Sequence, residues 1–244
     1  MSKGNALVIG CSGGIGKELL KQLLVSEQYQ TVFGVSRCVV TDKVAGVNYY
    51  QLADQDENAI ERCIDSLRQQ GQFSLVTSCI GALHGQQNGV NLAPEKRLED
   101  ISAQQLASYF HINTIIPMLW LKHILPLVKG HNKSQVVLFS ARVGSISENN
   151  LGGWYGYRAS KAALNMLIKT SQIEYTRRAK NVELVSYHPG TVNTALSEPF
   201  QANVPSGKLF DVEFTVSQLL THLANLEIEN APHYIDWQNE TIKW

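Results

Sequence analysis

A tyrosine and a lysine four residues apart are the side chains in this sequence best suited to proton transfer. Tyr157 and Lys161 lie in a segment that predicts a helix over Trp154–Ala179, so both fall on one helical face. A tyrosine hydroxyl has an ordinary pKa of about 10, which suits acid–base chemistry at neutral pH poorly. A lysine ammonium one turn away favours the phenolate, and we therefore expect Lys161 to lower the pKa of Tyr157.

A second chemical feature is the glycine-rich turn GCSGGIGK (10–17), which joins an apolar strand to a helix. Glycines permit positive φ and close backbone approach, and the N–H groups at a helix N-terminus attract an anion. We therefore expect a phosphate-bearing ligand; the alternative is a tight turn without one. The P-loop pattern fails twice, because its first glycine falls on Cys11 and its Ser/Thr on Glu18.

Two other motifs compete for the same turn. Gly10–Gly14 matches the GxSxG nucleophile elbow literally, with Ser12 as the nucleophile. An α/β-hydrolase takes its oxyanion-hole loop from an earlier strand, however, and only nine residues precede Gly10. Dinucleotide binding is the stronger interpretation, although the glycines follow GxxxGxG at 10, 14 and 16 instead of GxGxxG.

That spacing, followed in order by Tyr157-x-x-x-Lys161 and by the turn PGTVNT (189–194), resembles the short-chain dehydrogenase/reductase family over the whole chain. The segments GALHG (81–85), PEKRLED (94–100), VGSISENNLGGW (143–154) and YRASKAALN (157–165) resemble its C-factor subgroup, named for a bacterial cell–cell signalling protein. The resemblance implies a nicotinamide-dependent oxidoreductase acting on a carbonyl or alcohol, with Tyr157 as general acid and base. Lys161 would also bond the nicotinamide ribose and relay protons through a water near Asn113.

The sequence departs from the family at the serine that binds the substrate oxygen. Counting back from Gly144, the Ser-x-x-Gly serine falls on Ala141, with Ser140 one residue earlier. A shift of one residue on a regular strand points a side chain to the opposite face, although a bulge could redirect it. Ser140 is the expected catalytic substitute, and Ser145 is the alternative.

The cofactor preference depends on the end of the second strand, where a carboxylate favours NAD and an arginine accommodates the 2′-phosphate of NADP. The sequence there is Val35-Ser36-Arg37 with no acid before Asp42, which favours NADP over NAD. The nearest acid after the third strand is Asp54. The expected cofactor-binding residues are Gly10, Ser12, Gly13, Gly14, Ile15, Gly16, Ser36, Arg37, Asp54, Gly81, Tyr157, Lys161, Pro189, Gly190, Val192 and Thr194.

Short apolar runs alternate with helical patterns along the chain. Strands are expected at 6–9, 31–36, 47–52, 74–80, 135–140, 182–187 and 233–236, and long helices at about 102–128 and 154–179. This alternation predicts an α/β fold: a Rossmann-like, doubly wound parallel sheet of about seven strands with helices on both faces. We expect one domain over 1–244, with loops at 82–99 and 195–214, the latter a substrate lid.

Composition narrows the partners and the compartment. Lys and Arg total 21, as do Asp and Glu, so no basic excess indicates nucleic acid or an anionic membrane. The four cysteines and the histidines His84, His111, His123 and His188 show no metal-ligand spacing. No segment predicts a signal peptide or a membrane span, so we expect a cytoplasmic protein. Charged residues are only 17%, which suits a large core or a buried subunit interface.

Two functions remain open at this stage. The first is an NADP-dependent oxidoreductase with a small carbonyl or alcohol substrate, assembled as a homodimer or homotetramer partly through the helices that carry Asn113 and Tyr157. The second is a cofactor-binding signalling or regulatory protein with weak or no turnover, which Ala141 and the subgroup's name suggest. The aromatic group Trp154, Tyr155 and Tyr157 could line an apolar substrate site or belong to the core.

Overall fold

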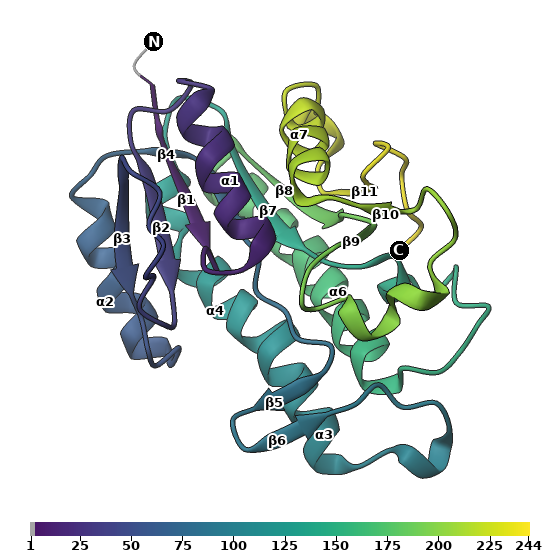
Figure 1. Cartoon of the computed structure of the whole chain (residues 1–244). Helices are drawn as coiled ribbons and strands as arrows, with labels where there is room; N and C mark the ends of the chain where they lie inside the picture. The colour runs from purple at the N-terminus through teal and green to yellow at the C-terminus, as the bar shows by residue number, and fades with distance from the viewer. Residues whose placement is uncertain (1–2) are drawn as a thin grey trace.

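The computed structural model describes residues 3–244, and its centre is a parallel sheet of seven strands. The order is β11-β8-β7-β4-β1-β2-β3, so the chain starts in the middle and builds outward twice (Figure 1). The strands are β1 (Asn5–Ile9), β2 (Val32–Ser36), β3 (Val47–Gln51), β4 (Phe73–Ser78), β7 (Ser134–Phe139), β8 (Val182–His188) and β11 (His233–Asp236). The predicted doubly wound α/β fold is confirmed.

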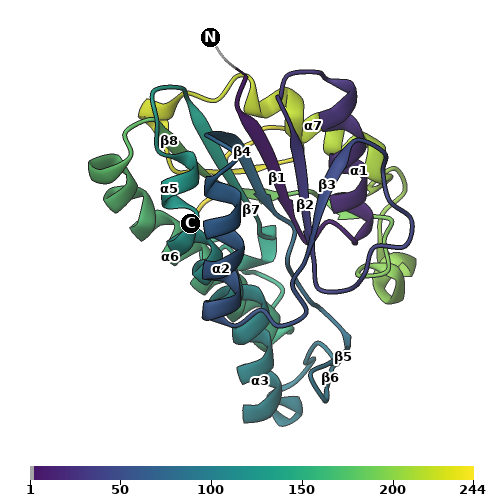
Figure 2. The ribbon, with the colours of Figure 1, turned by 90° about the vertical axis from the view of Figure 1, so that its left-hand side faces the viewer.

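Helices cover both faces of this sheet, as Figure 2 shows. One face packs against α2 (Glu57–Arg68), α4 (Ile116–His123), α5 (Leu125–Val128) and α6 (Tyr155–Arg178). The other packs against α1 (Gly14–Val25) and α7 (Val212–Leu223). Because the central strands are covered on both faces, β1 is buried at all five positions, which explains the apolar run at residues 6–9.

Local capping explains where several helices begin. Asp56 accepts a hydrogen bond from the N–H of Ala59 at α2 (2.7 Å), and Asp211 accepts one from Phe214 at α7 (2.6 Å). Each satisfies a backbone donor that the helix itself leaves unpaired. Helix α7 consequently starts at Val212, directly after its capping residue.

The long helix predicted over 102–128 is divided into four segments. α3 (Ala103–Phe110) runs into a π-helical turn, His111–Ile115, which is followed by α4 and α5. Pro126 has no N–H to donate, and the helix is interrupted at Ile124, two residues before this proline. The predicted span is therefore helical nearly throughout, but it is interrupted at Ile124 and contains an irregular turn, which carries Asn113 and which the sequence pattern did not predict.

The two predicted long loops contain short elements. Within 82–99, β5 (Gly85–Gln87) and β6 (Val90–Leu92) form a hairpin around Asn88-Gly89, both at positive φ (+49° and +79°). An Asn-Gly pair is the preferred sequence for such a two-residue turn. Within 195–214, a 3₁₀ helix (Glu198–Asn203) precedes β10 (Leu209–Phe210), which pairs with β9 (Thr191–Val192).

Candidate active site

The segments expected to bind and react meet at the carboxyl edge of the sheet. The glycine turn follows β1, Gly81 follows β4, Ala141 follows β7, and Pro189-Gly190 follows β8. Ligands of open parallel sheets bind at this edge, outside the strand ends. The topology thus places these four segments beside one another, although they span residues 10–190 of the chain.

The glycine turn is built for close backbone approach. Gly10 has φ +81°, and a Cβ on Gly16 would lie 2.5 Å from the carbonyl oxygen of Gly10. Any side chain at Gly16 would therefore push the first turn of α1 off the end of β1. The tight contact keeps the N-terminus of α1 directed over the strand edge.

The N-terminus of α1 has the features of an anion site. Gly13 caps it without a side-chain hydrogen bond, and its first turn contains no acidic residue. Ser12, Gly13 and Gly14 are exposed, whereas Ile15 is half-buried. Free N–H groups at the positive end of a helix suit a pyrophosphate, so these residues fit a dinucleotide cofactor.

The end of β2 presents an exposed arginine. Ser36 is buried and its hydroxyl accepts a hydrogen bond from the N–H of Cys38 (3.2 Å), which turns the chain and leaves Arg37 exposed. The nearby acid Asp42 forms an ion pair with Lys17 on α1, and this contact lowers the pKa of its carboxyl group. Asp54 is exposed beyond the end of β3.

The Pro-Gly turn closes over the glycine turn from the other side. Gly190 has φ +77°, and Thr194 lies so near Gly14 that a Cβ there would be 3.2 Å from the Thr194 methyl carbon. Val192 is buried in β9. The structure thus brings together the two ends of the expected cofactor site.

Asn113 occupies the π-helical turn and is fully buried. Its Oδ1 accepts from the N–H of Ala82 (2.8 Å), and its Nδ2 donates to the Ala82 carbonyl (3.0 Å) and to the hydroxyl of Ser160 (3.1 Å). The side chain therefore ties the segment after β4 to α6. π-Turns of this kind are frequent at functional sites.

Lys161 lies beside Gly81 and Asn113. Its Nζ donates to the carbonyl of Phe139 at the end of β7 (2.8 Å) and lies 6.0 Å from the ring centre of Tyr157. A Cβ on Gly81 would stand 3.4 Å from this Nζ and 3.6 Å from Asn113 Oδ1, so glycine leaves room around the amine. Tyr157 is 7% exposed.

Burial governs the titration of both groups in this structure. It lowers the pKa of Lys161 to about 8 and raises that of Tyr157 well above its ordinary value, with a smaller contribution from Tyr234. The prediction that Lys161 lowers the pKa of Tyr157 is not met here, because desolvation opposes charge on either group. The hydroxyl of Tyr157 is therefore protonated at neutral pH.

The hydroxyl of Ser140 is occupied by a partner on α6. The Ser140 hydroxyl donates to Oδ1 of Asn165 on α6 (2.7 Å), which also accepts from Ser186 (2.7 Å). Ala141 instead packs in the apolar cluster that contains Tyr157. This geometry favours a role for Ser140 in holding β7 to α6, and its contact with substrate stays a prediction. The hydroxyl of Ser145 accepts from the N–H of Glu148 (3.2 Å).

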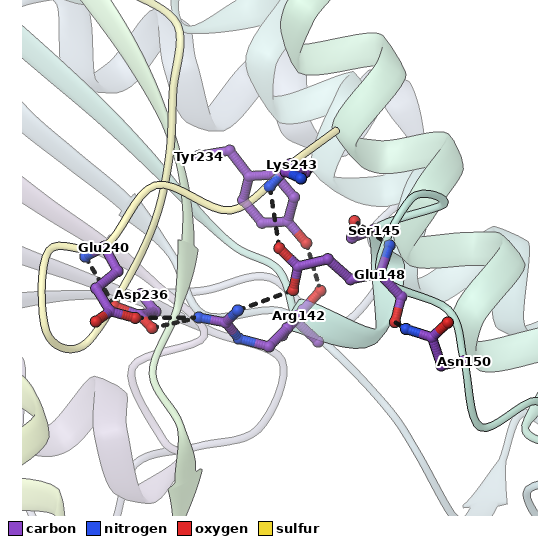
Figure 3. A network of polar contacts seen from close by, with 9 residues as sticks. Arg142, Ser145, Glu148, Asn150, Tyr234, Asp236, Glu240 and Lys243 are labelled. Atoms are coloured by element: carbon purple, nitrogen blue, oxygen red, sulfur yellow. Dashed lines mark hydrogen bonds and ion pairs between the residues drawn. The ribbon is translucent and has the colours of Figure 1, made fainter.

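A charged network fixes the segment that follows Ala141 (Figure 3). Arg142 bonds Glu148 (2.8 Å) and Asp236 of β11 (2.5 Å), and Tyr234 donates to the carbonyl of Ala141 (2.7 Å). These contacts join the loop after β7 to the C-terminal part of the chain. The backbone at Ala141 is therefore held by Tyr234, which also contributes to the raised pKa of Tyr157.

Apolar and aromatic groups surround Tyr157. The cluster comprises Ala82, Leu83, Leu92, Tyr109, Ile112, Ala141 and Tyr157, with Ile80, Val90, Val143, Trp154 and Phe200 packed against it. Trp154 contacts both the ring of Tyr157 (6.2 Å between centres) and that of Phe200 in the expected lid (5.1 Å). His84 bonds the Ala195 carbonyl (2.9 Å), which links the two long loops.

Sequence reasoning missed several of these groups. The carboxylate of Glu95, which accepts from the N–H of Gly156 (3.1 Å), comes from a distant segment. So do the hydroxyl of Tyr234 and the ring of Phe200, and no local spacing connects them to Tyr157. Only the Asn88-Gly89 pair carried a readable signal, for the hairpin. Among residues 3–244, His, Cys, Asp and Glu side chains form no group that could hold a metal ion. Over the same span, no helix has the length and apolar character needed to cross a bilayer.

Comparison with known proteins identifies the family. Residues 4–205 match the family described as short chain dehydrogenase, and the chain belongs to it. It is thus an oxidoreductase of the short-chain dehydrogenase/reductase type, a family that uses a nicotinamide cofactor.

Individual relatives cover most of the chain. A benzil reductase ((S)-benzoin forming) of Bacillus cereus is 25% identical over 97% of both chains. The C-signal of Myxococcus xanthus is 29% identical over 60% of this chain and 83% of that protein. The NADPH-bound carbonyl reductase from chicken fatty liver has the same fold over 100% of both chains, with a TM-score of 0.84 and 22% identity.

Proposed function

We propose that the protein is an NADP-dependent reductase of small carbonyl compounds, with Tyr157 as the proton donor. The observation that carries the proposal is the convergence of Tyr157, Lys161, Asn113 and Gly81 at the sheet edge where the glycine turn also opens. The NADPH-bound chicken carbonyl reductase and the benzil reductase of Bacillus cereus support the same reaction by likeness.

A nicotinamide cofactor held by the glycine turn would supply hydride for the carbonyl carbon. The chain's own residues manage the proton: the Tyr157 hydroxyl gives its proton to the carbonyl oxygen as the C–O bond becomes single. Burial raises the pKa of this hydroxyl and keeps it protonated at neutral pH, which is the form that reduction requires of a proton donor. Lys161 would hold the ribose of the cofactor and return a proton to Tyr157. Asn113 bonds the N–H of Ala82 and so fixes the segment after β4, where Gly81 borders the Lys161 amine.

The substrate we expect is apolar around its carbonyl group. The residues that pack around Tyr157 are aliphatic or aromatic, and Ala141 replaces a hydroxyl with a methyl group. Phe200 in the lid, 195–214, and Trp154 at the start of α6 would cover a bound ring or alkyl chain. A screen of ketones and aldehydes that follows NADPH absorbance tests this proposal, and failure of every carbonyl compound would contradict it.

A second candidate is a signalling or regulatory protein that binds the cofactor with little turnover. The specific observation in its favour is Ala141, since no hydroxyl there can stabilise the developing alkoxide, and the likeness to the C-signal adds to it. Tight NADPH binding without Tyr157-dependent turnover in the screen would support this candidate.

We propose that in either case the chain is a single domain over residues 1–244 and is cytoplasmic.

Arg37 should set the preference for NADP over NAD. Its exposed guanidinium at the end of β2 can pair with a 2′-phosphate, which NAD lacks. We expect Arg37→Ala to weaken NADPH binding by about tenfold and to leave NADH binding within about twofold. Titration of both cofactors by fluorescence measures this, with Arg62→Ala, an exposed arginine on α2, as the control. An unchanged ratio of the two affinities would exclude this role.

We propose a homodimer or homotetramer in which α6 contributes to the interface. Met166 and Ile173 are 65% and 61% exposed and lie seven residues apart, on one face of α6. Replacing both with glutamate should convert the assembly to monomers at micromolar concentration, because a buried unpaired charge opposes association. Analytical ultracentrifugation checks this, and Val25→Glu, a change at an exposed position on α1, should leave the assembly intact. A monomeric wild-type protein would refute the proposal.

A further inference from the structure

Helix α6, which carries Tyr157 and Lys161, begins without a cap of its own. Its N-cap residue Trp154 is in the left-handed region (φ +53°) and makes no side-chain capping bond. The first turn contains no acidic residue. The backbone donors of this turn and the positive end of a 24-residue helix therefore need a partner from elsewhere.

Glu95, 61 residues away in sequence from Gly156, is that partner. Its side chain is buried (1% exposed), and Oε2 accepts from the N–H of Gly156 (3.1 Å). Its backbone carbonyl accepts from the N–H of Trp154 (2.5 Å). The approach requires glycine at 156, because a Cβ there would lie 2.9 Å from Glu95 Oε1.

Gln105 on α3 holds the Glu95 carboxylate in place. Its Nε2 donates to Glu95 Oε1 (2.7 Å), while its Oε1 accepts from the N–H of Ala93 (2.8 Å). The two side chains thus form a continuous chain of hydrogen bonds from Ala93 to Gly156. Such a satisfied buried network fixes one arrangement of the groups that it joins.

This network lies directly beside the reacting group. Gly156 immediately precedes Tyr157, and a Cβ at 156 would stand 2.4 Å from the ring of Tyr109. Tyr109 packs edge-on against Tyr157, with 6.3 Å between ring centres, and its hydroxyl donates to the Leu83 carbonyl (2.6 Å). The first turn of α6 and the ring of Tyr157 are therefore supported by the same few contacts.

We propose that Glu95 is a positioning residue that sets the orientation of Tyr157 by capping α6. The inference rests on the proposed function, because it assigns a catalytic consequence to the cap. A displacement of about 1 Å at a proton donor is enough to slow a reaction strongly, so loss of the cap should act on kcat.

The test compares Glu95→Ala with a double variant, Glu95→Gln combined with Gln105→Glu, in which the two side chains are exchanged. The amide at position 95 can still accept from Gly156 and donate to position 105. The carboxylate at position 105 can still accept from Ala93, so the exchange keeps every hydrogen bond. Glu99→Ala, at an exposed acid in the same segment, is the matched control. The measurements are kcat, KM for the carbonyl substrate, the Kd of NADPH, and amide hydrogen exchange of residues 154–161.

We expect Glu95→Ala to lower kcat at least about tenfold, with KM and the Kd of NADPH within about threefold, and to speed exchange at the start of α6. The double variant should restore kcat and exchange protection to within about threefold of the wild type, and Glu99→Ala should match the wild type. If Glu95→Ala does not fold, Gln105→Ala, which removes one bond to the carboxylate, should show a drop in kcat in the same direction.

An unchanged kcat in Glu95→Ala, or a folded double variant that stays as slow as Glu95→Ala, would overturn the positioning role. Failure of the proposed function looks different. The wild-type chain would then lack Tyr157-dependent turnover, while Glu95→Ala would still expose the first turn of α6 to exchange.

Discussion

Tyr157→Phe should lower kcat for carbonyl reduction by about 10³-fold and leave NADPH binding within about threefold. The variant keeps the ring that packs against Tyr109 and Trp154 and removes only the hydroxyl. Ala141 offers no hydroxyl, and that of Ser140 is bonded to Asn165. We therefore expect little residual proton donation to the carbonyl oxygen.

The matched control for this variant is Tyr155→Phe, which removes a hydroxyl from the same turn of α6. Tyr155 lies outside the apolar cluster around Tyr157, so its variant should retain wild-type kcat. Single-turnover measurement of NADPH oxidation separates the chemical step from product release. Equal rates in Tyr157→Phe and the wild type would show that another group supplies the proton.

Order along the chain explains why the fold and the main residues could be predicted. Each βα unit of a parallel sheet returns to the same edge, so Gly10, Gly81, Tyr157 and Gly190 had to meet once their elements were recognised. The Tyr157–Lys161 pair and the glycine turn are local patterns, and local patterns can be read from spacing alone.

What could not be predicted depends on contacts across the fold. Helical periodicity cannot reveal that one extra residue is accommodated at His111–Ile115, because the apolar pattern continues through the turn. The partner of the Ser140 hydroxyl is Asn165, on another element. Glu95, which caps α6, lies 61 residues from Gly156, whose N–H donates to it. The titration of Tyr157 depends on how deeply it is buried, which the Tyr-x-x-x-Lys pattern does not contain.

Lys161→Met should abolish most turnover and at the same time stabilise the ligand-free protein at pH 7. Burial lowers the pKa of Lys161 to about 8 in the folded chain, against about 10.4 when unfolded. Between these values the unfolded chain binds more protons, so stability rises with pH there. Below pH 8 the ammonium is buried in charged form, which costs the folded state about 3 kcal/mol.

Methionine removes that cost but leaves the Phe139 carbonyl without its donor, a loss of about 1 kcal/mol. The net gain of about 2 kcal/mol corresponds to a rise in Tm of roughly 4–8 °C for a chain of this size. Thermal unfolding of the two proteins at pH 7, 9 and 10.5 measures it, and the difference in Tm should shrink as the pH rises. Lys180→Met, at an exposed position after α6, should show neither effect. At pH 7, a Tm for Lys161→Met at or below that of the wild type would contradict this prediction. It would mean that the buried ammonium of Lys161 does not destabilise the folded protein.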